Sequence, residues 1–326
     1  MKRRTFFKKG LGLGGGLLLF KSSLAACTER ATTQARIVHI KNDRVHDKNH
    51  VVDSLVLLKM LDEALLAFYN KDNLREAWRC VVLPGEVVGL KVNCLSGRGT
   101  THRELVEAIS ERLQQAGIKG RNIIIWDRLN RDLEEAGFKI NIRGKGVRCF
   151  GNDSVGFENR LETFGSAGSL VSKIPARLCD GIINLPVLKD HSIAGVTFSL
   201  KNMFGAIHNP NKYHLNVGDP YIADINMLPS LRNKIRLNIC DAIEMQYHGG
   251  PSFMPQWRWD FNSLLVGTDR VALDYTGWQI IEAKRKERGM PSLREDGREP
   301  TYIATAADAH HRLGTNDPEK MEIVKI

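Results

Sequence analysis

The stretch that decides the fold is EVVGLKVNCLSGRGTTHRELVEAISERLQQAGIKGRNIIIW, residues 86–126. It begins with the apolar run Glu86–Val92 after the turn Pro84-Gly85, which is typical of a buried strand. A glycine-rich turn leads into the helical spacing of Thr101–Gln115, which ends at Gly117. The next apolar run, Asn122–Trp126, predicts a second strand. A strand, a helix and a second strand in this order indicate a parallel pairing with the helix on one face.

The rest of the chain repeats this alternation. Further strands are expected at residues 36–40, 181–185, 234–241, 263–266 and 321–325, and further helices at 51–69, 195–204, 222–231, 270–286 and 302–313. Alternating strands and long helices predict an α/β protein whose mostly parallel sheets are covered on both faces. Glycine, serine and proline accumulate near residues 160–175, so we expect two Rossmann-like lobes, residues 36–170 and 171–326, with a cleft between them.

The N-terminus has the pattern of an export signal. Arg3-Arg4 followed by Phe6-Phe7 and Lys8 is similar to a twin-arginine leader, and a short apolar run (residues 11–20) follows it. Leu24-Ala25-Ala26-Cys27 is similar to a lipobox, in which the cysteine is lipidated. The prediction is an export signal over residues 1–26, lipidation at Cys27 and a linker over residues 27–35. The mature protein would be periplasmic or anchored to the membrane through its lipid, and a simple cleaved leader is the alternative.

The charge balance depends on this leader. The whole chain has 47 basic and 37 acidic residues, a net charge of +10. Residues 1–26 hold six of the basic residues and none of the acidic ones, so the remainder has a net charge of only +4. The excess is spread along the chain, so nothing favours nucleic-acid binding.

The cysteines do not form a metal-binding or cluster-binding motif. No Cys-x-x-Cys pair occurs, so the sequence has no iron–sulfur motif and no zinc ribbon. Cys149, Cys179 and Cys240 lie in or beside apolar runs, which is typical of buried thiols. One or two disulfides are compatible with an exported protein, but the spacing does not pair them.

The first candidate site follows the first buried strand. Lys91 and Asn93 end that strand, and Thr100, Thr101 and His102 precede the helix. Ligands of open parallel sheets bind at strand ends and helix starts, where free backbone N–H groups suit an anion. Alternatively, Thr101 and Glu104 form a capping box that needs no ligand.

The second candidate is the segment from Asn184 to His208. It interleaves Lys189, His191, Lys201 and Asn202 with small and apolar residues, as the lining of a pocket does. His191 can act as a general acid or base or as a metal ligand, and Lys201 can hold an anion or form a covalent adduct. We expect Gly195 to let the backbone approach a ligand closely.

Acids follow three apolar strands and extend the candidate set. Asp127, Asp241 and Asp269 each stand at or just after a predicted strand end, where side chains share a cleft. Asp269 directly precedes a helix and is the best candidate for a helix cap. Histidines 208, 214 and 248 lie in loops, but their spacing matches no standard metal site, and no metal can be named from the sequence.

Six motifs in one order resemble the domain-of-unknown-function 362 family, over nearly the whole mature chain. They are Lys-x-Asn, Thr-Thr-His, Asn-x-Pro-x-x-Lys-x-His, Thr-x-x-x-Lys-Asn-x-x-Gly, Asp-Ala-Ile and Thr-Asp-x-x-Ala-x-Asp, at residues 91–93, 100–102, 184–191, 197–205, 241–243 and 268–274. Some members of that family carry an iron–sulfur extension, which this chain lacks. The resemblance implies no established reaction.

A more distant resemblance concerns His191-x-x-Ala194-Gly195 followed by Lys201. This segment is similar to one in nickel-pincer lactate racemases, in which the His does acid–base work and the Lys tethers a pyridinium-derived nickel cofactor. The segment that starts at Thr101-His102-Arg103 also resembles the first domain of that family. Ser199-Leu200 stands where the family has Gly-Gly, and Asp-x-Thr-Arg does not occur. The resemblance implies a shared two-domain α/β plan more than it implies racemisation.

Two functions fit these observations. The first is an enzyme for a small anionic substrate, with a metal or metal-organic cofactor as an option. In it, His191, Lys201 and His102 would be catalytic, and substrate or cofactor would be bound by Lys91, Asn93, Thr100, Thr101, Lys189, Asn202, Asp127 and Asp241. The second is a lipid-anchored solute-binding or accessory protein for a respiratory or redox complex, with a protein partner and no catalysis.

Overall fold

The fold is described from a computed structural model, over residues 34–95 and 97–326. The described strands are β1 (Ala35–Lys41), β2 (Val88–Lys91), β3 (Ile123–Trp126), β4 (Arg148–Cys149), β5 (Glu162–Phe164), β6 (Ala167–Ser169), β7 (Gly181–Asn184), β8 (Val187–His191), β9 (Gly195–Thr197), β10 (Ile235–Gln246), β11 (Arg258–Gly267) and β12 (Met321–Lys325). The described α-helices are α2 (Ser54–Tyr69), α3 (Leu74–Arg79), α4 (Arg103–Gln115), α5 (Asn130–Glu135), α6 (Tyr221–Asn226), α7 (Pro229–Arg232), α8 (Arg270–Glu287) and α9 (Tyr302–Ala307).

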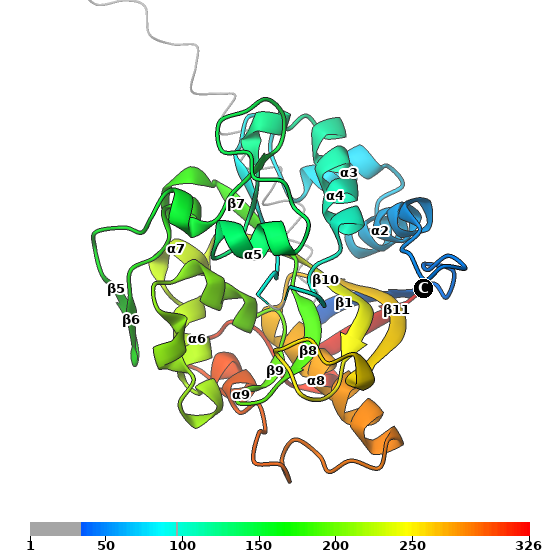
Figure 1. Ribbon diagram of the computed structural model, residues 1–326, viewed down its shortest axis with the longest axis vertical. Helices are drawn as coiled ribbons and strands as arrows, with labels where there is room; N and C mark the ends of the chain where they lie inside the picture. The colour runs from blue at the N-terminus through cyan, green and yellow to red at the C-terminus, as the bar shows by residue number, and fades with distance from the viewer. Residues whose placement is uncertain (1–33, 96) are drawn as a thin grey trace, which may run out of the picture.

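Ten of the described strands form one large sheet (Figure 1). Its main path is β12-β1-β11-β10-β7-β2-β3-β4, and β8 and β9 branch from β10. Most neighbours are parallel, and the antiparallel pairs are β1 with β11, β10 with β11, and β8 with β9. The α/β class with a mostly parallel sheet is confirmed. Because β2 pairs with β7, strands from both predicted lobes join in this sheet.

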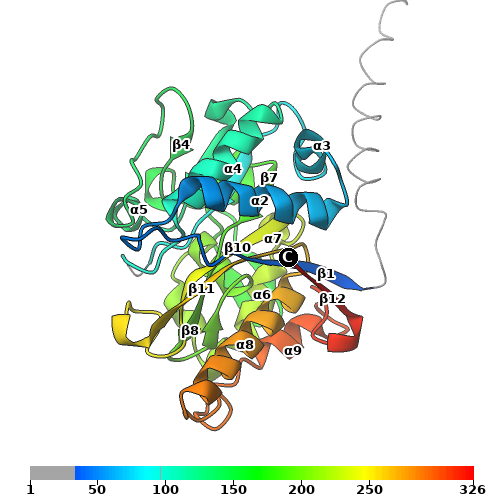
Figure 2. The same cartoon turned by 90° about the vertical axis from the view of Figure 1, so that its right-hand side faces the viewer.

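Helices cover both faces of the sheet. Figure 2 shows α2 and α4 on one side and α8 and α9 on the other. Leu57, Leu61 and Leu65 of α2 recur at helical spacing and are fully buried against β1 and the inner strands. On the opposite face, α6, α8 and α9 pack on two further apolar clusters. This three-layer arrangement leaves the carboxyl ends of β2, β3 and β7 as neighbours at one edge of the sheet.

Most of the predicted elements are present. The helix predicted over residues 222–231 is divided into α6 and α7, and the helix predicted over residues 302–313 ends at Ala307. The helix predicted over residues 195–204 is wrong. Residues 195–197 form β9, which pairs antiparallel with β8, and a short 3₁₀ helix, η4, follows over Lys201–Ala206. The β-branched residues Val196 and Thr197 and the left-handed backbone of Gly195 favour the hairpin over a helix.

The capping box predicted at Thr101 is also wrong. The residue at the start of α4 is His102, and its side chain does not cap the helix. The Thr101 hydroxyl instead donates to the carbonyl of Leu185 at 2.7 Å and accepts the N–H of Asn93 at 2.8 Å. Thr101 therefore joins the loop after β2 to the end of β7. The cap predicted at Asp269 is confirmed, because its carboxylate accepts the N–H groups of Val271 and Ala272 in the first turn of α8.

The predictions for the N-terminus lie outside the described residues. They concern the export signal over residues 1–26, lipidation of Cys27 and most of the linker over residues 27–35. Among the residues that the structure describes, no helix combines the length and the apolar character needed to cross a membrane. The division of the chain into two lobes at residue 170 stays a prediction.

Candidate functional site

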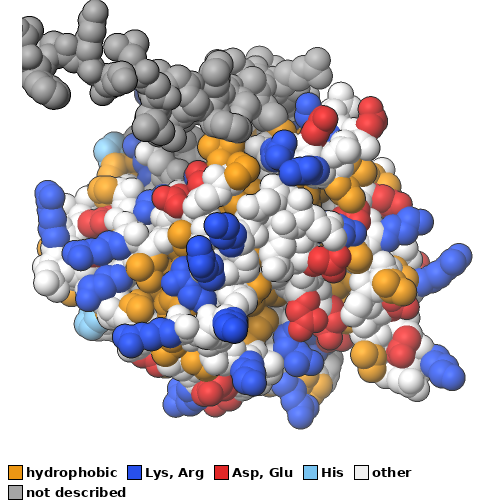
Figure 3. Space-filling model, turned by 90° about the horizontal axis from the view of Figure 1, so that it is seen from above, with side chains coloured by type: hydrophobic (Ala, Val, Ile, Leu, Met, Phe, Trp, Pro, Cys, Tyr) orange, Lys and Arg blue, Asp and Glu red, His pale blue; other side chains and the backbone are white. Residues whose placement is uncertain are grey.

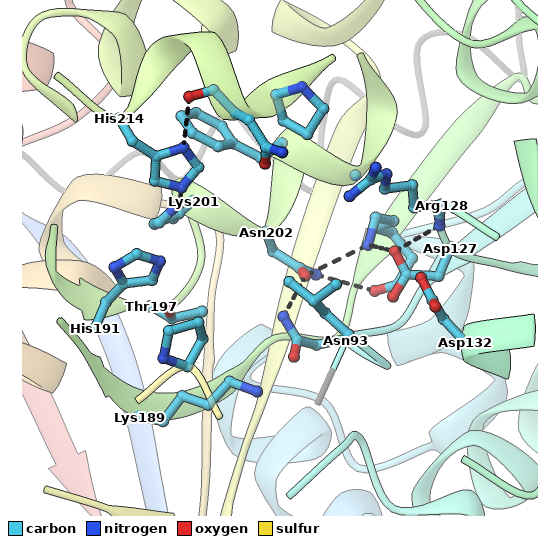
Figure 4. Close-up of a pocket in the computed structure, with 17 residues that line it drawn as sticks. Asn93, Asp127, Arg128, Asp132, Lys189, His191, Thr197, Lys201, Asn202 and His214 are labelled. Carbon is cyan, nitrogen blue, oxygen red and sulfur yellow. Dashed lines mark hydrogen bonds and ion pairs between the residues drawn. The ribbon is translucent and has the colours of Figure 1, made fainter. Parts of the chain in front are cut away.

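A pocket lies beside the carboxyl ends of the inner strands (Figure 4). It has a volume of about 90 Å³ and is lined by Lys91, Asn93, Leu95, Asp127, Arg128, Asp132, Lys189, His191, Thr197, Lys201, Asn202, Phe204, Gly205, Pro210, Asn211, His214 and Pro251. Because one buried water needs roughly 10–15 Å³ of such space, the pocket suits a ligand of only a few non-hydrogen atoms.

One wall of the pocket is a buried ion pair between neighbouring strands. Lys91 ends β2, Asp127 follows β3, and the Nζ of Lys91 lies 2.7 Å from a carboxylate oxygen of Asp127. The other oxygen of Asp127 accepts the N–H of Cys94 at 2.7 Å. Both side chains are almost completely buried, so each stabilises a charge that would be costly alone. Lys91 and Asp127, at the ends of neighbouring strands, therefore lie together as predicted.

The amide of Asn202 connects this wall to the rest of the site. Its oxygen accepts from the side-chain N–H of Asn93 at 3.1 Å, and its own N–H donates to the side-chain oxygen of Asn184 at 2.7 Å. Asn184 in turn donates to the side chain of Asn238 on β10 at 2.9 Å. This chain of amides holds the first turn of η4 in a fixed orientation against β7 and β10.

The hairpin of β8 and β9 forms a second wall. Alternate residues of a strand share a face, so Lys189 and His191 point into the pocket together, and Thr197 lies opposite Lys189 in the register. Burial lowers the pKa of Lys189 to about 8. Asp190, on the other face, accepts from the side chain of Arg298 at 3.1 Å and so anchors the hairpin.

The ring of His191 has a defined proton position. Its Nδ1 accepts the backbone N–H groups of Ile193 and Ala194, both at 3.1 Å. Burial, followed by the nearby charge of Lys201, lowers the pKa of His191 to about 2, so the ring is neutral. A neutral ring that accepts at Nδ1 carries its proton at Nε2. His191 is thus a hydrogen-bond donor at Nε2.

Lys201 and His214 form the third wall. The Nζ of Lys201 lies 2.9 Å from Nε2 of His214 and 4.0 Å from the centre of the Phe204 ring. No carboxylate of the described residues lies within ion-pair distance of this amine. Burial lowers the pKa of Lys201 to about 7 and also lowers the pKa of His214. The amine therefore changes charge near neutral pH.

Three buried polar atoms in the lining have no hydrogen-bond partner among the described residues. They are the side-chain oxygen of Asn93, the hydroxyl of Thr197 and one carboxylate oxygen of Asp132. Burial, followed by the nearby Asp127, raises the pKa of Asp132. Unsatisfied buried polar groups cost free energy, and they are expected where a ligand or water completes the hydrogen bonds.

A glycine allows η4 to approach the ion pair. A Cβ added at Gly205 would lie 2.7 Å from Cε of Lys91 and 2.8 Å from a carboxylate oxygen of Asp127. Any side chain at position 205 would therefore displace this ion pair.

Four of the predicted site residues lie outside the pocket. His102 begins α4, and its Nδ1 lies 2.8 Å from the carboxylate of the fully buried Asp241. Burial alone would lower the pKa of His102, but the attraction of Asp241 raises it to about 9. Thr100 lies with His102 at a separate cavity, and Thr101 is held by the backbone contacts described above. The structure thus brings together Lys91, Asn93, Asp127, Lys189, His191, Lys201 and Asn202, and separates His102, Thr100, Thr101 and Asp241 from them.

Other details of the sequence prediction differ from the structure. Gly195 has a φ of +72° and permits the approach of the Arg298 carbonyl, because an added Cβ would lie only 2.2 Å from that oxygen. This protein contact replaces the ligand expected there. His208 packs edge-on against Phe157, and His248 packs against Trp257.

Sequence reasoning did not assign several lining residues to the site, among them Thr197, Phe204, Arg128 and Asp132. His214 was considered only as a metal ligand. A signal was available for Thr197, which is separated from Lys189 by a turn of a possible hairpin. None was available for His214, whose contact with Lys201 depends on the path of the loop after η4.

The comparisons with known proteins agree with the motifs. The family model for a domain of unknown function, DUF362, matches residues 88–279, which is more than half of the chain. The chain belongs to the DUF362 family. The match reaches from β2 into α8 and includes all seven of the predicted site residues that are gathered in the pocket. No curated protein sequence matches this DUF362 chain.

Two solved structures have a weak similarity to this DUF362 protein. One is a protein from Thermotoga maritima, with 10% identity, a TM-score of 0.38, and coverage of 73% of this chain and 59% of that one. The other is the lactate racemase apoprotein from Thermoanaerobacterium thermosaccharolyticum, with 14% identity, a TM-score of 0.41, and coverage of 69% and 55%. The chain thus spans less than two thirds of either structure. Similarity at this level carries no argument about function.

The pocket of this DUF362 protein also bears on the cofactor suggested by the distant sequence resemblance. Its volume of about 90 Å³ is too small for a nucleotide-sized organic group. The Nζ of Lys201 is also already enclosed by His214 and Phe204. The described pocket therefore does not fit a tethered organic cofactor, and we derive no step through one.

Proposed function

We propose that this protein is an enzyme that binds a small oxyanion or carboxylate in the pocket and transfers a proton to or from it. The observation that carries this proposal is the pair of Lys201 and His214. A buried amine whose pKa is about 7 exists in both protonation states near neutral pH, as a general acid–base group requires.

The proposed roles follow from the contacts of each group. Lys201 in its neutral form accepts a proton from the bound substrate at Nζ and later returns it. His214, which receives a hydrogen bond from that amine at Nε2, orients it. His191 donates from Nε2 to an oxygen of the substrate, because its Nδ1 is already engaged by two backbone groups. We therefore assign acid–base work to Lys201 and substrate binding to His191.

Anion binding is supported by the charges of the lining. Lys189 is buried in the wall formed by β8 and β9 and carries a positive charge over part of the neutral pH range. Arg128 adds a second cation to the lining. The unpartnered groups of Asn93 and Thr197 offer an acceptor and a hydroxyl to a ligand that also has polar hydrogen atoms. A small hydroxy acid or amino acid has this combination of groups.

The test compares the wild-type protein with Lys201→Met and Lys212→Met. Lys212 is an exposed lysine of the neighbouring loop and serves as the matched control. Small 2-hydroxy acids, 2-oxo acids and amino acids are incubated with each protein in D₂O, and proton NMR records the loss of the C2-proton signal or, for 2-oxo acids, the C3-proton signal. We expect exchange by the wild type and by Lys212→Met, and a decrease of at least ~100-fold in Lys201→Met.

Binding is measured separately with the same acids, by their effect on the melting temperature. Saturable binding without exchange would reject the enzyme and favour the solute-binding alternative. Absence of both binding and exchange would reject the pocket as a site for this class of anion.

We also propose that the protein is exported and anchored to the membrane through a lipidated Cys27. The twin-arginine and lipobox patterns of residues 1–27 support this proposal. A protein partner belongs to the accessory-protein alternative, and nothing in the charge distribution supports nucleic-acid binding.

A further inference from the structure

A second polar cluster lies on the described residues away from the pocket, and it joins a loop to two strands. His46 and His50 belong to the segment between β1 and α2, Glu244 lies on β10 and Asp260 lies on β11. One ligand atom from each of these residues lies within 4.8 Å of all the others. We propose that this cluster is a Zn²⁺ site, independent of the proposed proton-transfer function.

The distances between the ligand atoms suit tetrahedral coordination. Nε2 of His46 lies 3.3 Å from Oε1 of Glu244, and Nε2 of His50 lies 3.7 Å from the same oxygen and 3.6 Å from Oδ1 of Asp260. Zinc binds such atoms at about 2.0–2.2 Å, which places neighbouring ligands of a tetrahedron about 3.4 Å apart. These three distances are close to that value, and the other pairs lie within 4.8 Å, so the four atoms draw together by at most roughly 1.4 Å to enclose the ion.

The hydrogen bonds behind His46 leave the ring nitrogen that faces the cluster ready to bind a metal. The amide N–H of Asn262 donates to Asp43 at 3.3 Å, so the amide oxygen faces Nδ1 of His46 at 3.1 Å. Nδ1 must then carry the proton, and Nε2 of the neutral ring has a free lone pair. An outer hydrogen bond that fixes the tautomer in this way is typical of histidines that bind metals.

Nε2 of His46 is also buried without a hydrogen-bond donor. The side chain is only 7% exposed, and within the described part of the chain Nε2 has no hydrogen-bond partner. It lies 3.3 Å from the oxygen of Glu244 but makes no hydrogen bond to it. A cation between the two atoms would bind both.

The carboxylates of Glu244 and Asp260 provide separate support for a bound cation. Glu244 and Asp260 are direct partners in the antiparallel register of β10 and β11. Like charges in this position destabilise a sheet unless a cation lies nearby. Arg258 pairs with Oε2 of Glu244 at 2.5 Å, which leaves Oε1 directed at the two histidines. Bound Zn²⁺ would neutralise this second oxygen and the charge of Asp260.

His50 completes the site from a strained backbone position. Its φ is +62°, in the left-handed region that few residues other than glycine and asparagine adopt readily. Its ring stacks on that of His46, with 4.4 Å between the centres. This arrangement brings its Nε2 toward both carboxylates.

The experiment titrates Zn²⁺ alone into full-length protein that has been treated with a chelator, and measures the heat of binding. His50→Asn and Asp260→Asn each remove one ligand. Both positions are exposed, by 59% and 45%, and asparagine tolerates the backbone of residue 50, so the fold is retained. His310→Asn removes an exposed histidine elsewhere and is the matched control. The melting temperature with and without Zn²⁺ is a second readout.

We expect one equivalent of Zn²⁺ in the wild type and in His310→Asn, and at least tenfold weaker binding in both ligand variants. Zn²⁺ should raise the melting temperature of the wild type and of the control more than that of the ligand variants. No saturable binding by the wild type, or equal affinity in all four proteins, would overturn the proposal. Neither result depends on the activity of the pocket.

Discussion

At the scale of single residues, buried amines and acids decide what the pocket can do. Lys201 is almost completely enclosed, yet no described carboxylate compensates its charge, whereas Lys91 at the same pocket is paired with Asp127. The two lysines therefore differ: Lys91 has a carboxylate partner, whereas Lys201 has none and can release a proton near neutral pH. Such unpaired buried groups reduce stability and are retained where function needs them.

This difference predicts how stability depends on pH. Burial lowers the pKa of Lys201 from its ordinary value of 10.5 to about 7 in the folded protein. Between these two values the unfolded chain binds the proton and the folded chain does not, so stability falls as the pH falls toward 7. Lys201→Met lacks this penalty. The free energy of unfolding of Lys201→Met should exceed that of the wild type by on the order of a few kcal/mol at pH 6 and by much less near pH 10.

Urea unfolding at pH 6, 8 and 10 measures this difference. A stability difference between Lys201→Met and the wild type that does not change with pH would contradict the lowered pKa. Lys212→Met, which replaces an exposed lysine, should show no such trend.

At the scale of secondary-structure elements, helix caps and the break between two consecutive strands position the site. Residues 181–191 contain two consecutive strands, β7 and β8, which both pair with the long strand β10. The break at Leu185-Pro186 separates them, because proline cannot donate to a sheet. β8 therefore continues past the end of β7 and brings Lys189 and His191 to the pocket that Lys91 and Asp127 also line.

The helix α8 offers a test at this scale. Asp269 accepts three backbone N–H groups, from Val271, Ala272 and Thr315, and so joins the start of α8 to the segment before β12. Replacing it with alanine should lower the free energy of unfolding by about 2 kcal/mol. Urea unfolding of Asp269→Ala measures this, with the exposed Asp72→Ala as the control. Equal effects in the two variants would show that the cap contributes little.

At the scale of the whole molecule, the first and the last described strands, β1 and β12, belong to the same large sheet. On the surface, basic, acidic and apolar side chains are mixed. Figure 3 shows lysine and arginine side chains beside acidic and apolar ones on the face viewed from above. β12 pairs parallel with β1, so the last residues of the chain complete the sheet next to the strand that follows the N-terminal segment.

The export proposal is tested on the chain that includes residues 1–27. Arg3→Lys combined with Arg4→Lys should keep the protein inside the cell, because twin-arginine export depends on the arginine pair. Cys27→Ala should permit export but abolish labelling by a fatty acid. Cell fractionation and labelling measure the two effects. Unchanged distribution and labelling in these variants would exclude both the leader and the lipid.

The sequence by itself determined the α/β class, most of the elements, the Asp269 cap and the grouping of Lys189, His191, Lys201 and Asn202. Those features depend on local periodicity and on residues close together in the chain, which the sequence displays directly. The tertiary structure decided which candidates meet. It brought Lys91 and Asp127 to the pocket, joined His102 to Asp241 outside it, and placed His46 and His50 beside Glu244 and Asp260. These contacts depend on strand order and register, which no local pattern encodes.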